Sequence, residues 1–209
     1  ENKFVNSNKL VVFFQSAEKG KKSLINKKKK WITFVGKLNK AKGYDVFSAA
    51  IKKILNKYPD WEAKIIGDEK RERIKLKHKN AKILGFLNHD EVIKIFKKTS
   101  IAVACSRWEE PFGRTSLEAS ANGCAVIITN KGGLPETSKS AVLLTNLNEK
   151  NLTKKIEKLI NNEKLLRKLQ KENYKNFHYT PSFITKKIVT IRNSLFPFKR
   201  FNMLRQRSK

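Results

Sequence analysis

The sequence predicts an α/β protein with a Rossmann-like parallel sheet of about six strands, flanked by helices and followed by further helices near the carboxyl terminus. From Trp31 onward, short apolar runs alternate with longer segments whose apolar residues recur every three or four positions. Several of the apolar runs stop at a glycine, as at Gly36, Gly67 and Gly85. Repeated strand–helix–strand units favour a parallel sheet that binds ligands at the carboxyl ends of its strands.

Six apolar runs have the length of a buried strand. They are Trp31–Val35, Ala63–Ile66, Ala81–Leu84, Ile101–Ala104, Cys124–Thr129 and Ala141–Leu144. Helical spacing of apolar residues predicts helices over Tyr44–Tyr58, which Pro59 follows, over Asp90–Lys98, and after Gly113.

The chain after Asn148 has the pattern of amphipathic helices. An Asn161-Asn162 break separates one apolar face from the next, and Pro181 begins a third candidate helix. The apolar residues expected to face inward from that third helix are Phe183, Ile184, Ile188 and Ile191.

Both ends of the chain differ in composition from its middle. The sequence opens on Glu1 without an initiator Met, so we expect residues 1–30 to be a linker or the end of an amino-terminal domain that is missing here. This segment contains a candidate strand, Leu10–Phe14, and the lysine run Lys27–Lys30, which we expect to be solvated and mobile. Residues 31–175 form the expected domain. Residues 176–209 form a helix and a basic, aromatic tail, for which contact with an anionic membrane surface is one interpretation.

The formal net charge of +29 invites a nucleic-acid interpretation, but its distribution argues against one. Residues 1–30 carry a net charge of +7 and residues 175–209 carry +9, so more than half of the excess lies at the two ends. Only nine of the 47 basic residues are arginine, the residue whose planar fork suits phosphates and base edges. We therefore expect no nucleic-acid partner and attribute the charge to a lysine-rich composition.

Cysteine and hydropathy patterns point to a cytoplasmic protein. Cys105 and Cys124 lack metal-type spacing and lie in apolar or strand-end settings, so we expect reduced core residues. No run of about 18 apolar residues is present. We expect His78, His89 and His178 to be surface or packing residues.

The stretch from Ser106 to Gly123 is the candidate functional site. A strand leads into a polar loop broken by Pro111 and Gly113, and a helix follows, which predicts an anion-binding helix amino terminus at the sheet edge. Glu110 and Glu118 lie in the same stretch and would repel a bare anion. A ligand with a central phosphate and sugar hydroxyls at both ends satisfies both features.

Three motifs carry a resemblance to a known family. They are Gly36-Lys37-Leu38 with Lys42-Gly43, then Glu110-Pro111-Phe112-Gly113 with Leu117-Glu118-Ala119, then Gly132-Gly133-Leu134-Pro135-Glu136. In this order they resemble the carboxyl-terminal, nucleotide-sugar-binding half of a family 4 glycosyltransferase. Such enzymes have the GT-B architecture of two facing Rossmann-like domains and transfer a sugar with retention of configuration.

The resemblance implies a role for each matched residue. Glu110 would hold hydroxyls of the donor sugar, and Glu118 would hold those of the ribose. Lys37 and Lys42 would meet the diphosphate and neutralise the leaving group, so no metal or other cofactor is expected. The resemblance implies further donor contacts from Gly36, Phe112, Gly113 and Arg114. Leu84 and Phe86 would lie beside the base.

The resemblance also implies partners and a setting. The donor would be a UDP- or GDP-sugar, and the acceptor, a glycan or lipid-linked molecule, would bind in the missing amino-terminal half, so the chain alone is expected to transfer nothing. Assembly of lipopolysaccharide or another cell-envelope glycan, in the cytoplasm or at the inner face of the membrane, is the implied role. Three alternatives stay open: a sugar-nucleotide epimerase of the same architecture, a basic nucleic-acid-binding module, and a scaffold that kept the fold and lost the chemistry.

Overall fold

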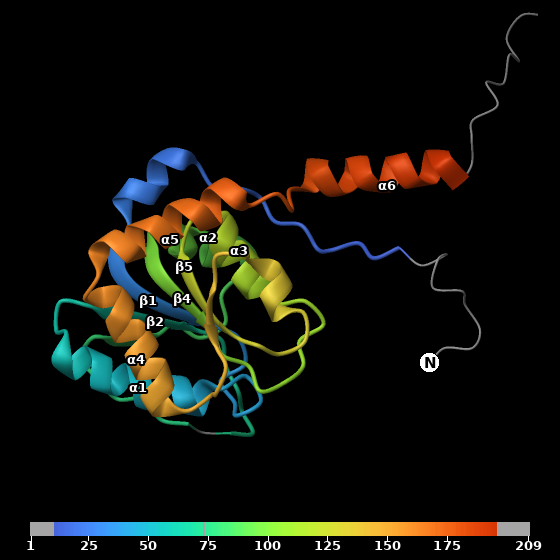
Figure 1. Ribbon diagram of the computed structural model, residues 1–209. Helices are drawn as coiled ribbons and strands as arrows, with labels where there is room; N and C mark the ends of the chain where they lie inside the picture. The colour runs from blue at the N-terminus through green and yellow to red at the C-terminus, as the bar shows by residue number, and fades with distance from the viewer. Residues whose placement is uncertain (1–10, 73, 196–209) are drawn as a thin grey trace, which may run out of the picture.

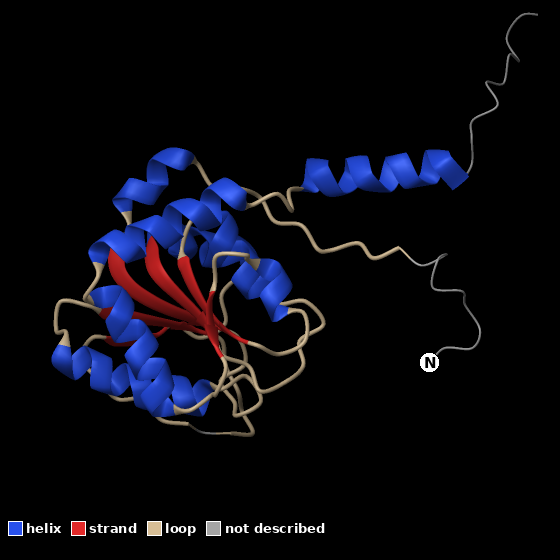
Figure 2. Cartoon of the chain, in the orientation of Figure 1, coloured by secondary structure: helices blue, strands red, loops and turns tan. Residues whose placement is uncertain are grey.

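The computed structural model, which describes residues 11–72 and 74–195, contains one six-stranded sheet (Figures 1 and 2). All of its strands run parallel, in the order β3-β2-β1-β4-β5-β6. In chain order the strands are β1 (Lys29–Val35), β2 (Glu62–Ile66), β3 (Ala81–Ile83), β4 (Thr99–Ala104), β5 (Ala125–Thr129) and β6 (Val142–Leu144). The predicted fold class and the six predicted strands are confirmed.

Helices cover both faces of the sheet (Figure 1). Their bounds are α1 (Tyr44–Lys57), α2 (His89–Lys98), α3 (Arg114–Ala121), α4 (Glu149–Ile160), α5 (Glu163–Asn176) and α6 (Pro181–Leu195). α1 and α4 pack on one face, and α2 and α3 pack on the other. α5 crosses the amino ends of β4 and β5, where Gln170 donates to the Ser100 carbonyl and Asn173 donates to the Cys124 carbonyl.

The core explains why these segments take these forms. β5 is buried along its whole length, as expected for a parallel strand with helices on both faces. α1 buries one face, including Phe47, Ile51 and Ile54, against β1 and α4. Cys105 and Cys124 are buried and unpaired, as predicted, and burial raises the pKa of the Cys105 thiol to about 12.

The amino-terminal segment differs from the prediction in two ways. Residues 11–20 form no strand, so the candidate strand Leu10–Phe14 is wrong over its described part; Val11, Val12 and Phe13 are exposed and pair with no sheet edge. The lysine run is not uniformly solvated either. Lys28 is half-buried, and its ammonium donates to the carbonyls of Phe96 and Asn122 at 2.8 and 2.7 Å. A short 3-10 helix, η2 (Lys22–Lys27), precedes it and packs near α2 and α5.

α6 is formed as predicted but does not face inward. It projects from the body of the molecule (Figure 1), and no residue from 181 to 194 is buried. Phe183 and Ile188 are 44% and 45% exposed, so the expected inward packing is wrong. The reason is geometric, because α1, α4, α2 and α3 already cover both faces of the sheet. Most of the predicted basic tail lies outside the described residues.

Within the described part of the chain, no helix combines the length and the apolar character needed to cross a bilayer.

Candidate functional site

The candidate site lies where the strand order reverses. β1 and β4 are adjacent, but β1 leads to β2 on one side and β4 leads to β5 on the other, and such a switch point is the usual ligand site of an open parallel sheet. An open hollow of about 570 Å³ occupies this position. Its lining comprises Phe34, Val35, Gly36, Lys42, Ala104, Cys105, Ser106, Glu110, Gly113, Arg114, Thr115 and Leu134.

An ion pair between Lys42 and Glu110 lies at the wall of the hollow. The Lys42 Nζ is 2.5 Å from the Glu110 Oε1, and the two side chains are only 33% and 14% exposed. The two residues are 68 positions apart, so the fold creates the pair. A half-buried cation at a sheet edge is suited to a phosphate, and the adjoining carboxylate is suited to hydroxyl groups.

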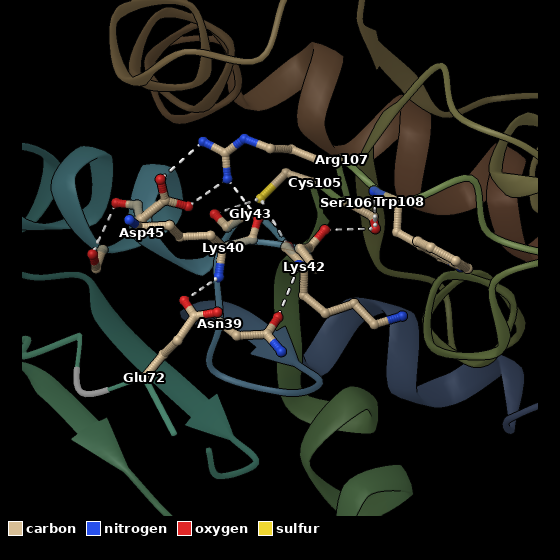
Figure 3. Close-up of polar contacts among 12 residues, drawn as sticks. Asn39, Lys40, Lys42, Gly43, Asp45, Glu72, Cys105, Ser106, Arg107 and Trp108 are labelled. Carbon is tan, nitrogen blue, oxygen red and sulfur yellow. Dashed lines mark hydrogen bonds and ion pairs between the residues drawn. The ribbon is translucent and has the colours of Figure 1, made fainter. Parts of the chain in front are cut away.

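The β1–α1 loop that carries Lys42 is held firmly against the end of β4 (Figure 3). Gly43 has a φ of +72°, and a Cβ added there would lie 2.0 Å from the Cys105 carbonyl oxygen, so only glycine permits this approach. Arg107 forms a two-point contact with Asp45 at 2.6 and 2.8 Å and also donates to the Lys40 carbonyl. Burial is the largest single influence on the pKa of Asp45 and raises it, but the hydrogen bonds and charge of Arg107, together with backbone hydrogen bonds, lower that pKa overall.

The loop that carries Glu110 is supported by the loop after β5. The Gly133 N–H donates to the Glu110 carbonyl at 2.7 Å, and the Gly132 N–H donates to the Glu109 carboxylate at 2.5 Å. A Cβ on Gly132 would lie 2.2 Å from the Glu110 carbonyl oxygen. The Gly132-Gly133 pair therefore positions the Glu110 backbone.

α3 begins at the hollow and carries Glu118 on its inner side. Gly113 takes the left-handed conformation that starts this helix, and Glu118 is only 4% exposed. The Glu118 Oε1 accepts from Arg114 Nε at 2.7 Å and contacts His89 Nε2 at 3.0 Å. A buried carboxylate needs such partners, because desolvation otherwise penalises its charge.

Arg114 belongs to the lining of the hollow, as Glu110 does, and is also bound to Glu118. Its Nε donates to the Glu118 Oε1. Because guanidinium groups present five N–H donors, the remaining ones stay available to an anion in the hollow. The positive end of the α3 dipole also lies at this point and favours negative charge.

The structure brings some of the predicted site residues together and leaves others apart. Glu110, Lys42, Gly36, Gly113 and Arg114 share the hollow. Glu118 is not part of its lining and reaches it only through Arg114.

Four other predicted positions lie outside the lining. The Phe112 ring is buried in a separate cluster and stacks on Phe14 with ring centroids 5.1 Å apart. Lys37 is exposed at the end of β1. Leu84 and Phe86 are exposed after β3.

Residues that contact each other across long sequence distances were not predicted as partners. His89 was predicted to be a surface or packing residue, yet it contacts Glu118. The Asp45–Arg107 pair and the contact of Asn39 with Glu69 were not foreseen either. The sequence features that could have suggested these contacts are local ones. Asp45 lies in the first turn of a helix, and Asn39 lies in a loop bounded by glycines.

A metal site is not formed by side chains in the described ranges: no three His, Cys, Asp or Glu residues of 11–72 and 74–195 gather in a way that could hold an ion.

Comparison with known proteins places this site in a family. The family described as glycosyl transferases group 1 matches residues 15–176, which is most of the chain. The chain belongs to this family. The predicted resemblance to a glycosyltransferase domain is thereby confirmed.

Relatives and solved structures agree with this assignment. An uncharacterized glycosyltransferase of Methanocaldococcus jannaschii is 37% identical over 153 residues, which are 69% of this chain and 42% of that protein. The carboxyl-terminal domain of a group 1 glycosyl transferase, LpcC of Francisella tularensis, superimposes with a TM-score of 0.62 at 26% identity, covering 84% of this chain and 96% of that one. Anabaena HepE in complex with UDP-glucose superimposes with a TM-score of 0.73 at 19% identity, covering 88% and 57%, and shows the shared fold.

The group 1 match extends over only part of the relatives. The chain covers 32% of the spore coat protein SA of Bacillus subtilis and 42% of the M. jannaschii protein. It therefore spans less than half the length of these curated relatives.

Proposed function

We propose that this chain is the donor-binding half of a retaining glycosyltransferase that moves a hexosyl group from a UDP- or GDP-sugar to a glycan or lipid-linked acceptor. The observation that supports it most directly is the Lys42–Glu110 pair in the hollow at the β1–β4 switch, beside Arg114 and the start of α3. This arrangement offers cations for a diphosphate and a carboxylate for a sugar.

In this proposal each group acts on a different part of the donor. Glu110 accepts hydrogen bonds from hydroxyls of the sugar, and Glu118 accepts them from the ribose. Lys42 and Lys37 face the diphosphate, where negative charge grows as the glycosidic bond breaks, and preorganised cations stabilise that charge. Arg114 adds a third cation beside the diphosphate, and no metal is needed.

The proposal also assigns a place to the rest of the protein. Residues 31–175 belong to the donor domain, and the packed segment that includes η2 adjoins it. A separate amino-terminal domain supplies the acceptor pocket, which the partial coverage of the relatives supports. The projecting helix α6 touches the inner face of the cell membrane, with the enzyme otherwise cytoplasmic. Cell-envelope glycan assembly is supported by relatives such as the lipopolysaccharide core mannosyltransferase LpsB of Rhizobium meliloti, which is 29% identical over 133 residues.

Isothermal titration calorimetry with UDP, GDP, UDP-glucose and GDP-mannose tests the proposal. The chain should bind at least one nucleotide sugar. Glu110→Gln should weaken binding of the nucleotide sugar about tenfold without weakening that of the free nucleotide, while Glu118→Gln should weaken both about tenfold, as for a hydrogen bond to a charged group. Glu157→Gln, which changes a surface contact with Lys57 at 2.8 Å, is the matched control and should change neither.

Incubation of the chain with the same nucleotide sugars, followed by product analysis, and a separate RNA and DNA binding assay distinguish the alternative functions. Transfer of sugar by this chain alone would contradict a missing acceptor pocket, and isomerised nucleotide sugar would favour an epimerase. Steeply salt-dependent RNA or DNA binding that survives both glutamate changes would favour a nucleic-acid-binding module. Failure to bind any nucleotide would favour a scaffold.

A further inference from the structure

His89 has a fixed position beside Glu118. It is the first residue of α2, and Asn88 caps this helix: the Asn88 side chain accepts from the Glu91 N–H, and the Glu91 side chain accepts from the Asn88 N–H, both at 3.0 Å. Such a reciprocal cap fixes the first turn of a helix. The imidazole extends from this turn to α3, where its Nε2 lies 3.0 Å from the Glu118 Oε1.

The chemistry of the contact determines the direction of the hydrogen bond. An ionised carboxylate only accepts, so the Nε2 of His89 carries the hydrogen and donates. The Nδ1 lies on the other side of the ring, 4.0 Å from the exposed Asp90 carboxylate. His89 is therefore oriented as a donor toward the buried glutamate.

The two oxygens of Glu118 are treated differently. Oε1 takes both donors, one from His89 on α2 and one from Arg114 on α3. Oε2 takes no hydrogen bond from any residue in 11–72 or 74–195, and it is not among the buried side-chain atoms that lack a partner, so it is accessible from solvent. A buried carboxylate with one oxygen saturated and the other left without a donor is prepared to accept hydrogen bonds from a ligand.

The two donors are not equivalent. Arg114 is one turn away on the same helix, and its long side chain is 62% exposed, so it can follow the carboxylate as it rotates. His89 has a short, stiff side chain on a capped helix and approaches from a separate element. His89 and Arg114 together restrict the rotation of the Glu118 carboxylate from two directions, which neither residue does alone.

We propose that His89 is a positioning residue that, together with Arg114, holds Glu118 so that Oε2 faces the vicinal hydroxyls of the donor's ribose. This inference rests on the proposed function and deepens it, because it assigns the discrimination between ribose and deoxyribose donors to a contact between α2 and α3. His89 itself does not touch the reacting atoms.

Binding of UDP and GDP, each compared with its 2′,3′-dideoxy counterpart, tests the inference by calorimetry. The unaltered chain should prefer the ribonucleotide. His89→Ala should weaken the ribonucleotide about three- to tenfold, the effect of losing one hydrogen bond to a charged partner, and leave the dideoxy compound unchanged. His89→Gln keeps an N–H donor on a side chain of similar reach and should restore most of the preference. Glu157→Gln, which changes only a surface contact of α4 with Lys57, is the control.

The outcomes distinguish this inference from the proposal beneath it. If Glu118→Gln abolishes the ribose preference but His89→Ala leaves it intact, His89 has no positioning role and the proposed function stands. An equal loss for ribo- and dideoxynucleotides in His89→Ala, with no recovery in His89→Gln, would also overturn the inference. If the unaltered chain binds neither nucleotide, the proposed function and the inference fail together. Because His89 is 54% exposed, these variants should fold, and circular dichroism verifies it.

Discussion

At the scale of single residues, the Lys42–Glu110 pair shows how two opposite charges are kept in one hollow. Each side chain neutralises the other inside this partly buried hollow, where an isolated charge would be costly. Under the proposed function, a diphosphate would be a stronger partner for Lys42, and the released carboxylate would accept sugar hydroxyls.

Two glycines illustrate the difference between backbone conformation and steric space. Gly43 and Gly85 have similar φ values of +72° and +68°. A Cβ at Gly43 would overlap the Cys105 carbonyl oxygen, whereas one at Gly85 would meet nothing within 4 Å.

The paired substitutions Gly43→Ala and Gly85→Ala should therefore differ sharply. Gly85→Ala should lower the free energy of unfolding by about 1–2 kcal/mol, the cost of a left-handed conformation for a residue with a Cβ. Gly43→Ala should lower it by at least about 2 kcal/mol more, because the β1–α1 loop must move away from β4. Urea unfolding followed by circular dichroism measures both; equal losses would show that the loop yields without cost.

At the scale of elements, the β1–α1 loop is held from two directions. Arg107 holds it toward the end of β4 through Asp45, and Glu69, after β2, holds it through Asn39 at 3.1 Å. Hydrogen bonds from Arg71 and then from Asn39 lower the pKa of Glu69 to about 2 from an ordinary 4.5. The loop that presents Lys42 is consequently linked to the ionisation of a carboxylate outside the hollow.

This linkage predicts how the free energy of unfolding depends on pH. A carboxylate whose pKa is lowered by folding contributes stability above its unfolded pKa, and that contribution disappears as the pH falls toward the folded value. The free energy of unfolding should therefore decline from about pH 4.5 toward pH 2, and Glu69→Gln should reduce that slope. Denaturant titrations between pH 6 and pH 3 measure it, with Glu163→Gln on the exposed side of α5 as the control. An unchanged slope in Glu69→Gln would contradict the linkage.

At the scale of the whole molecule, the carboxyl-terminal region divides into a packed part and a projecting part. Phe177 is buried with Phe112, and the Tyr179 ring lies edge-on to Phe112 with centroids 5.9 Å apart. α6, by contrast, contributes no buried residue between 181 and 194; Lys187 makes a long contact, 3.5 Å, to the Val12 carbonyl. Among residues 11–72 and 74–195, the last part that supports the site is therefore the segment before Pro181.

Two truncations test this division. A chain that ends at Thr180 should keep its unfolding free energy within about 0.5 kcal/mol, as for surface changes in general. A chain that ends at Asn176 also loses Phe177 and Tyr179, and it should lose about 2–3 kcal/mol, the value of burying one large apolar side chain. It should also bind nucleotide more weakly, because Phe112 adjoins Gly113 at the start of α3. If both truncations are equally stable, the aromatic cluster does not support the site.

Local patterns in the sequence were sufficient for the fold class, the six strands, the helices and the short stretch that carries Glu110 and Glu118. These features depend on neighbours in the chain: the spacing of apolar residues sets which face is buried, and glycine marks where strands stop. For the same reason α6 was correctly predicted as a helix. Its surroundings were not, because an apolar stripe shows that a helix can pack and does not show that both faces of the sheet are already covered.

Tertiary structure alone decided which side chains meet. The contact of His89 with Glu118 joins residues 29 positions apart, that of Arg107 with Asp45 joins residues 62 apart, and that of Lys42 with Glu110 joins residues 68 apart. No periodicity connects such positions, since the parallel order β3-β2-β1-β4-β5-β6 brings their loops to one edge only after the whole sheet has assembled. Local sequence thus supplies the chemical groups suited to a nucleotide sugar, and the assembled sheet brings a subset of them together.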